Sequence, residues 1–131
     1  MTLLHVNADG CLWRMRDRDG PDLSAWLDRL APDRPVPILI HGFRYAPSVT
    51  GRDPHETILS RAESLPGWDL PWPRHLGLTA GGPDLGIAFG WKGCGSFWHA
   101  RAEARRAGLA LAALVGRIRA LSPRRRVTVL A

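Results

Sequence analysis

The chain has 131 residues, of which 45% are hydrophobic and 23% are charged, a composition that is typical of one globular domain and excludes wholesale disorder. The formal net charge of +6 invites a nucleic-acid-binding interpretation, but residues 1–84 carry nine Arg against eleven acidic residues, while residues 85–131 carry nine Lys and Arg against Glu103 alone. The excess therefore falls on one predicted helix and its exit turn, where charges usually form a solvated face.

The two cysteines, Cys11 and Cys94, are too few and too far apart in the sequence for a metal site or a disulfide framework. No apolar run reaches the length of a membrane span, and the N-terminus lacks the pattern of a signal peptide. We therefore expect free thiols in a reducing cytoplasm, no metal or cofactor, and no membrane partner.

Two short segments with strand-like composition open the chain, at Thr2–Val6 and Cys11–Met15. The residues between them, Asn7-Ala8-Asp9-Gly10, favour turns and left-handed conformations. The sequence therefore predicts an antiparallel hairpin.

Gly20-Pro21-Asp22 interrupts the chain after this hairpin. Apolar side chains then recur at positions that share one helix face, namely Leu23, Trp26, Leu27 and Leu30. This spacing predicts a short amphipathic helix that ends before Pro32.

The apolar run Val36–Ile40 is followed directly by His41-Gly42. A run of this length, bounded by turn residues, is typical of a strand buried on both faces. In open α/β sheets, ligands bind at the turns that follow the carboxyl ends of such strands. We therefore expect the functional edge of the sheet at this turn, where Gly42 allows a close backbone approach.

From residue 44 to residue 84 the chain is rich in Pro, Gly and Trp, which predicts a long loop excursion over the sheet. Loops of this length are uncommon in compact domains and tend to be functional. Within it, Asp53 has the position of an N-cap, Pro54 that of a first helical residue and Glu56 that of a capping-box partner. A helix of one or two turns through Ser60 is predicted.

The second strand-like run, Leu85–Trp91, leads to the strongest helical pattern of the chain. Its apolar positions step by four and three: Ala100, Ala104, Ala107, Leu111, Leu114, Ile118 and Leu121. They predict a helix over Phe97–Leu121 with Ser96 as its N-cap, in which Gly108 would mark a close approach to the sheet. The final run, Val127–Ala131, predicts another buried strand, parallel to the preceding one because the crossover is long and right-handed.

In this order, the features resemble the N-terminal part of an α/β-hydrolase of the esterase and lipase superfamily, similar to a group of uncharacterised bacterial members. The resemblance rests on the opening hairpin, the strand that ends in His-Gly at Val36–Phe43, the motif Ala88-Phe89-Gly90-Trp91, and the helix that leads into Val127–Ala131. It implies an α/β fold in a single, incomplete domain over residues 1–131. An antiparallel hairpin would precede parallel strands in the order 1-2-4-3-5, with helices on both faces and Val127–Ala131 at an exposed apolar edge.

The resemblance also implies that the nucleophilic Ser, the acid and the catalytic His follow Ala131, so that this chain alone would be inactive. A Gly-x-Ser-x-Gly pattern is absent, since Ser96 has Cys94 and Trp98 at the flanking positions. We therefore interpret four histidines as polar, packed or solvent-facing rather than catalytic: His41, His55, His75 and His99.

What the resemblance does transfer is one half of an oxyanion hole. The first donor would be the Phe43 backbone N–H, with His41 and Gly42 supporting the loop. A plain strand-to-loop turn is the alternative. Four aromatic residues could line a substrate pocket over this hole or could instead cover the sheet as core: Tyr45, Trp68, Trp72 and Trp91.

Two hypotheses of function follow. The first is a serine α/β-hydrolase acting on carboxylic esters or related acyl compounds, with a small-molecule acyl substrate as its partner. The second is a non-catalytic phosphate- or nucleic-acid-binding module, which would use the turn Gly90–Ser96 or a basic surface. That turn lacks the Walker and Rossmann spacings, and nucleic acid is the less favoured partner. The basic surface would comprise Arg101, Arg105, Arg106 and Arg124–Arg126.

Overall fold

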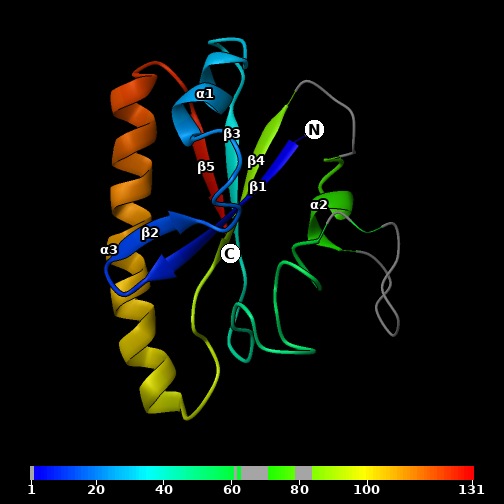
Figure 1. Ribbon diagram of the computed structural model, residues 1–131, viewed down its shortest axis with the longest axis vertical. Coiled ribbons are helices and arrows are strands. Elements are labelled where there is room, and N and C mark those ends of the chain that lie inside the picture. The colour runs from blue at the N-terminus through cyan, green and yellow to red at the C-terminus, as the bar shows by residue number, and fades with distance from the viewer. Residues whose placement is uncertain (1, 61, 63–70, 79–83) are drawn as a thin grey trace.

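The computed structural model describes residues 2–60, 62, 71–78 and 84–131, and a five-stranded mixed sheet lies at its centre (Figure 1). The strands follow the order β2-β1-β4-β3-β5. Strands β1 and β2 pair antiparallel, and the other three pairs are parallel. The predicted α/β class, with a hairpin followed by parallel strands, is confirmed.

The predicted hairpin consists of β1 (Thr2–Asp9) and β2 (Leu12–Met15). Its turn is only Gly10-Cys11, and Gly10 has a φ of 62°, a left-handed conformation that suits a residue without a Cβ. Strand β1 is longer than the predicted segment Thr2–Val6, because its last three residues pair with β2 instead of turning.

The parallel strands are β4 (Leu85–Gly90), β3 (Val36–Ile40) and β5 (Val127–Leu130). Every residue of β4 is buried, as expected for an apolar strand with both faces covered. Strand β5 pairs with β3 at one end of the sheet. Its residue Val129 is 45% exposed, so the predicted apolar edge is present.

The predicted strand order, 1-2-4-3-5, is wrong at its first two positions. Strand β1, and not β2, lies beside β4, with six residue pairs in parallel register from Thr2↔Leu85 to Asn7↔Gly90. The burial of the two strands explains this arrangement. Strand β1 has eight residues and carries buried Leu and Val side chains, whereas β2 has four residues, none of them buried. A short strand with no buried residue is the better edge.

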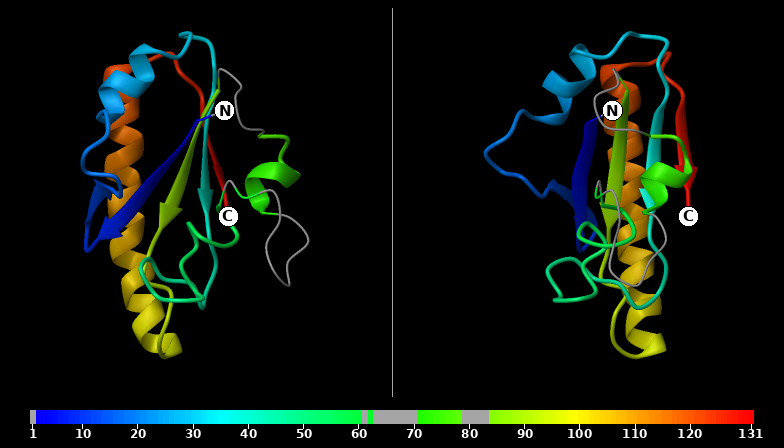
Figure 2. Two further views of the ribbon diagram at one scale, coloured as in Figure 1. Left: turned by 45° about the vertical axis from the view of Figure 1, so that its right-hand side comes forward. Right: turned by 90° about the vertical axis from the view of Figure 1, so that its right-hand side faces the viewer.

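Helices α1 (Leu23–Asp28) and α3 (Phe97–Leu121) lie on one face of the sheet and share its larger core (Figures 1 and 2). The Asp22 carboxylate caps α1 by accepting a backbone hydrogen bond. Ser96 caps α3 as predicted, because its hydroxyl accepts from the His99 N–H at 3.2 Å. Within the described parts of the chain, neither helix nor any other combines the length and apolarity needed to cross a bilayer.

The buried stripe of α3 largely matches the prediction. Of the seven predicted positions, four are buried: Ala100, Ala107, Leu114 and Ile118. Ala104 is exposed. The predicted close approach at Gly108 is wrong, since a Cβ placed there would meet no atom within 4 Å.

The opposite face of the sheet is covered by α2 (Trp72–His75) and by the segment 53–60 (Figure 2). The described residues of the predicted excursion from residue 44 to residue 84 thus contain one short helix. The buried residues of this side form a smaller core: Leu3, Leu39, Ile58, Leu59 and Ala88. Helices therefore lie on both faces, as predicted, although the second cover is thin.

The helix predicted to start at Asp53 is wrong. Residues 54–59 form successive turns instead, and the Leu59 N–H reaches back five residues to the Pro54 carbonyl. The capping signature is used differently: Glu56 pairs with Arg16 at 3.0 Å rather than reaching back to Asp53. Arg16, which follows β2, thus takes the Glu56 carboxylate that a local helix cap would need.

Candidate functional site

The loop that follows β3 is fixed against the connection that follows β4. The Arg44 N–H donates to the Gly93 carbonyl at 2.9 Å, and the Gly93 N–H donates to the Tyr45 carbonyl at 2.8 Å. Arg44 adopts a φ of 81°, a left-handed conformation that is uncommon for a residue with a side chain. The Cys94 thiol donates to the Arg44 carbonyl at 2.9 Å. These contacts hold the turn at Phe43-Arg44 in one position.

His41 lies beneath this loop and is 2% exposed. Its Nδ1–H donates to the Gly42 carbonyl at 2.8 Å, and its Nε2 accepts from the Trp91 N–H at 2.9 Å. The indole N–H of Trp91 returns a hydrogen bond to the His41 carbonyl, and the two rings stack with centroids 5.5 Å apart. His41 therefore links the turn after β3 to the first residue after β4.

These partners define the protonation state of His41. Burial lowers its pKa, and the hydrogen bonds to Gly42 and Trp91 oppose that shift only in part. A neutral ring with its proton on Nδ1 satisfies both nitrogens, whereas a second proton on Nε2 would face the Trp91 N–H. Both ring nitrogens are thus committed to the backbone, which agrees with the non-catalytic interpretation of this histidine.

Gly93 lies close to the loop that follows β3. A Cβ placed there would lie 2.9 Å from the Tyr45 carbonyl oxygen and 3.2 Å from that of Gly42. Both atoms belong to the backbone, so a side chain could be accommodated only by moving the loop. Glycine at this position therefore sets the position of the turn.

The Phe43 N–H has no hydrogen-bond acceptor among the described residues. The Phe43 side chain is 46% exposed, and the turn lies at the carboxyl edge of the parallel strands. A fixed loop thus presents a backbone donor that no other described residue uses.

The four aromatic residues predicted for a pocket are only partly brought together. Tyr45 and Trp91 both contact the His41 ring, Tyr45 edge-on at 5.8 Å. Trp72 packs with Tyr45 against the smaller core, whereas Trp91 packs against the larger one on the other face. Trp68 lies outside the described residues.

An apolar cavity of about 240 Å³ adjoins His41 on the α3 side of the sheet. Ile40, Phe89 and Trp91 form its sheet wall, and α3 contributes its other wall around Gly108. Gly108, where the sequence predicted that the helix would approach the sheet closely, instead borders this cavity.

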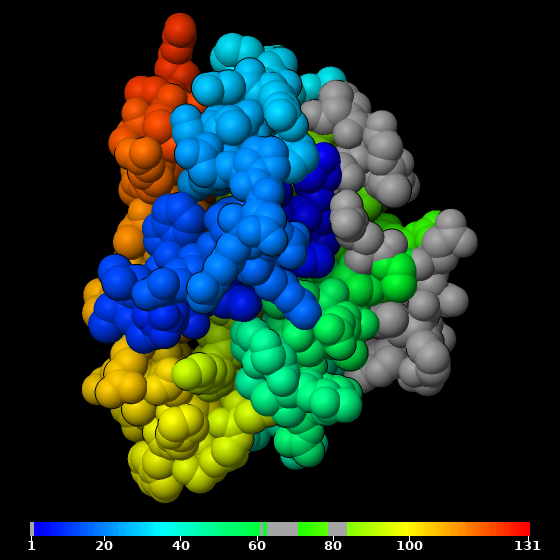
Figure 3. Space-filling view, in the orientation of Figure 1, coloured from blue at the N-terminus to red at the C-terminus, as the bar shows by residue number. Residues whose placement is uncertain are grey.

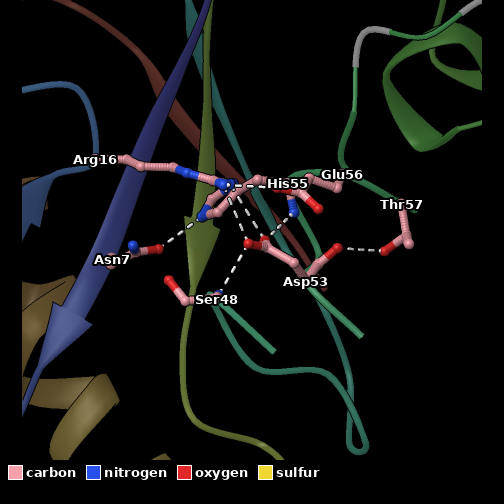
Figure 4. A network of polar contacts seen from close by, with 7 residues as sticks. All are labelled: Asn7, Arg16, Ser48, Asp53, His55, Glu56 and Thr57. Atoms are coloured by element: carbon pink, nitrogen blue, oxygen red, sulfur yellow. Dashed lines mark hydrogen bonds and ion pairs between the residues drawn. The ribbon is translucent and has the colours of Figure 1, made fainter. Parts of the chain in front are cut away.

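A second cluster, missed by the sequence interpretation, surrounds Asp53 (Figure 4). Asp53 is 2% exposed, and its carboxylate accepts from the backbone N–H groups of Ser48 and His55, each at 2.9 Å. Arg16 approaches the same carboxylate at 3.2 Å. The buried charge is therefore paired and hydrogen-bonded, as burial of a carboxylate requires.

His55 extends this cluster to β1. Its Nε2–H donates to the Asn7 side-chain oxygen at 2.6 Å, while its Nδ1 is buried with no hydrogen-bond partner among the described residues. Burial first, and the neighbouring His5 second, lower the pKa of His55 to about 3. Gly90 makes room for the pair, since a Cβ there would lie 2.6 Å from the Asn7 side-chain oxygen and 2.7 Å from His55 Nε2.

The remaining predicted features lie apart from these two clusters. His75 and His99 are exposed, in agreement with the solvent-facing interpretation. Cys11 and Cys94 are free thiols, as predicted. Within the described part of the chain, no group of His, Cys, Asp or Glu side chains is arranged to hold a metal ion.

Comparisons of the chain with protein families, with curated proteins and with solved structures found no match.

Proposed function

We propose that this chain forms the N-terminal portion of a serine α/β-hydrolase that acts on carboxylic esters or related acyl compounds. In this proposal the Phe43 N–H supplies one half of the oxyanion hole, and the nucleophilic Ser, the acid and the catalytic His follow Ala131. The chain alone would then bind no oxyanion productively and would not turn over an ester.

The observation that carries the proposal is the Phe43 N–H, which has no acceptor among the described residues although its loop is held by hydrogen bonds on both sides. The Arg44 N–H, the Tyr45 carbonyl and both nitrogens of His41 all have partners. Oxyanion-hole donors act by being held in place before charge develops, and one such donor is worth about 2.7–4 kcal/mol in the transition state. A loop fixed by hydrogen bonds that leaves the Phe43 N–H free among the described residues has the properties that this role requires.

The apolar cavity beside His41 supports an acyl substrate. Its lining consists mainly of aliphatic and aromatic side chains, and its volume of about 240 Å³ is slightly smaller than that of most small-molecule pockets. We propose that a short acyl group occupies it, with the carbonyl oxygen directed toward the loop after β3.

The experiment that tests this function compares two products of the same reading frame: residues 1–131, and a product that continues past Ala131. Both are treated with a fluorophosphonate probe, which reacts with activated serines. We expect labelling of the longer product only, at a serine after Ala131. A labelled serine within residues 1–131 would contradict the proposal, as would a longer product that resists the probe while folded.

The alternative, a non-catalytic phosphate- or nucleic-acid-binding module, finds less support at the sites proposed for it. In the turn Gly90–Ser96, the N–H groups of Trp91 and Gly93 already donate within the protein. In the basic surface, Arg106 pairs with Glu103 at 2.8 Å. Arg125 is buried and donates to backbone carbonyls, so it does not belong to the surface.

A further inference from the structure

A hollow of about 410 Å³ lies beside the β1–β2 hairpin, at the carboxyl edge of the sheet. Its walls come from the end of β1, from β2 and its exit, from residues 47 and 48, and from Lys92 after β4. In Figure 3 the blue hairpin, the green segment and the yellow-green start of the β4 connection meet on the face toward the viewer. This basic hollow is separate from the Phe43 turn, which does not line it.

Positive charge dominates the lining of the basic hollow. It carries four cationic side chains, Arg14, Arg16, Arg18 and Lys92, against one carboxylate, that of Asp9. Arg14 is paired with Asp9 at 2.7 Å, and Arg16 with the Asp53 cluster. Arg18 and Lys92 form no ion pair or hydrogen bond with any residue that the structure describes. Two uncompensated positive charges therefore face the hollow from different connections.

Two neutral donors complete the lining. Because His55 donates to the Asn7 side-chain oxygen, the Asn7 amide has a fixed orientation, with its NH₂ group on the side away from His55 (Figure 4). Ser48 gives its backbone N–H to Asp53, and its hydroxyl points away from that carboxylate (Figure 4). The Asp53 cluster thus uses one polar group of each residue and leaves the other for a ligand.

We propose that the basic hollow binds the phosphoryl group of a small phosphorylated molecule or free phosphate. Arg18 and Lys92 supply charge, and the Asn7 amide and the Ser48 hydroxyl donate to the phosphoryl oxygens. A guanidinium and an ammonium that line one hollow together with neutral donors suit the charge and the acceptor oxygens of a phosphate. The volume suits a small ligand rather than a polymer backbone. This site requires no nucleophile and is independent of the hydrolase proposal.

The test is a titration of the 131-residue chain with inorganic phosphate, glycerol 3-phosphate and acetate at constant ionic strength, followed by the backbone amide shifts of Asn7, Ser48 and Lys92. The double variant Arg18→Gln, Lys92→Gln is compared with Arg101→Gln, Arg105→Gln. The control removes the same charge from the exposed side of α3.

We expect saturable shifts with the phosphates and weaker ones with acetate. The double variant should bind phosphate at least tenfold more weakly, which corresponds to about 1.4 kcal/mol, because it loses two charge-assisted contacts. The control should stay within about twofold of the wild type. If glycerol 3-phosphate binds more tightly than inorganic phosphate, the ligand of the basic hollow is a phosphorylated metabolite. If the two bind equally, the ligand is free phosphate.

Two results would contradict the proposal that the basic hollow binds phosphate. Non-saturable shifts would show that the hollow only concentrates anions. Equal weakening in the control variant would show that the net charge of the chain, and not the hollow, attracts phosphate. An unchanged amide spectrum outside the substituted positions confirms that each variant folds.

Discussion

His55 is the residue whose chemistry depends most on its surroundings. It is neutral, 3% exposed, and joined to Asn7 by its Nε2–H. The same side chain at an exposed site would be half protonated at about pH 6.5. In the folded protein its depressed pKa makes it a fixed neutral donor, which orients the Asn7 amide toward the basic hollow.

The depressed pKa of His55 predicts a pH-dependent stability. As the pH falls below about 6.5, the unfolded chain takes up a proton that folded His55, with its pKa of about 3, does not. The contribution of His55 to the free energy of unfolding is therefore full above pH 6.5 and is lost progressively toward pH 3, by up to about 1.4 kcal/mol per pH unit. We expect the free energy of unfolding, measured with urea between pH 6.5 and pH 5, to fall less steeply with decreasing pH for His55→Gln than for the wild type.

His99→Gln is the matched control for this measurement, because His99 is exposed on α3. Its slope should equal that of the wild type. Equal slopes for His55→Gln and the wild type would instead mean that His55 is solvated in the folded state.

At the scale of elements, Arg125 fixes the end of α1 to the approach of β5. The guanidinium is buried, and it donates to the carbonyls of Ala31 and Arg34 at 2.9 Å each. It also donates to those of Leu27 and Leu30 at 3.3 and 3.2 Å. These carbonyls belong to the last turn of α1 and the loop after it, where the helix dipole favours a positive charge.

Replacing this side chain should destabilise the fold. Arg125→Met keeps much of the length but leaves four carbonyls without their donor, and we expect a loss of about 2–3 kcal/mol in the free energy of unfolding. Arg124→Met and Arg126→Met change exposed neighbours in the same way and should cost less than about 0.5 kcal/mol. Urea unfolding at pH 7 measures all three. A similar loss in the three variants would contradict the structural role of Arg125.

At the scale of the whole molecule, most helices and strands could be predicted from the sequence, but the neighbours of each strand in the sheet could not all be predicted. Strand β4 and helix α3 follow from local patterns, because apolar runs and helical spacing act within a few residues. The exchange of β1 and β2 could not be predicted in this way. It depends on which strand is long and apolar enough to lie beside β4, and that is a comparison across the chain.

The same distinction applies to the sites. The turn at His41-Gly42-Phe43 was predictable, since an apolar strand that ends in His-Gly carries a local signal. The cluster at Asp53 was not, because Asp53 reads locally as a helix cap. Its partners Arg16 and Asn7, the latter through His55, come from the hairpin some 40 residues earlier. Only the packed sheet brings them together.

The central claim concerns a backbone group, so its most direct test removes that group alone. Phe43 precedes Arg44, whose φ of 81° matches the third position of a type II turn, and proline is common at the second position of that turn type. Phe43→Pro deletes the N–H, whereas Phe43→Ala keeps it and removes only the side chain.

The decisive measurement is kcat for p-nitrophenyl acetate, made with both variants in the product that continues past Ala131. We predict that Phe43→Pro lowers kcat by about 100- to 1000-fold, as expected for the loss of one oxyanion-hole donor, while Phe43→Ala stays within about tenfold of the wild type. Equal kcat values for Phe43→Pro and Phe43→Ala would contradict the assignment of this N–H to an oxyanion hole.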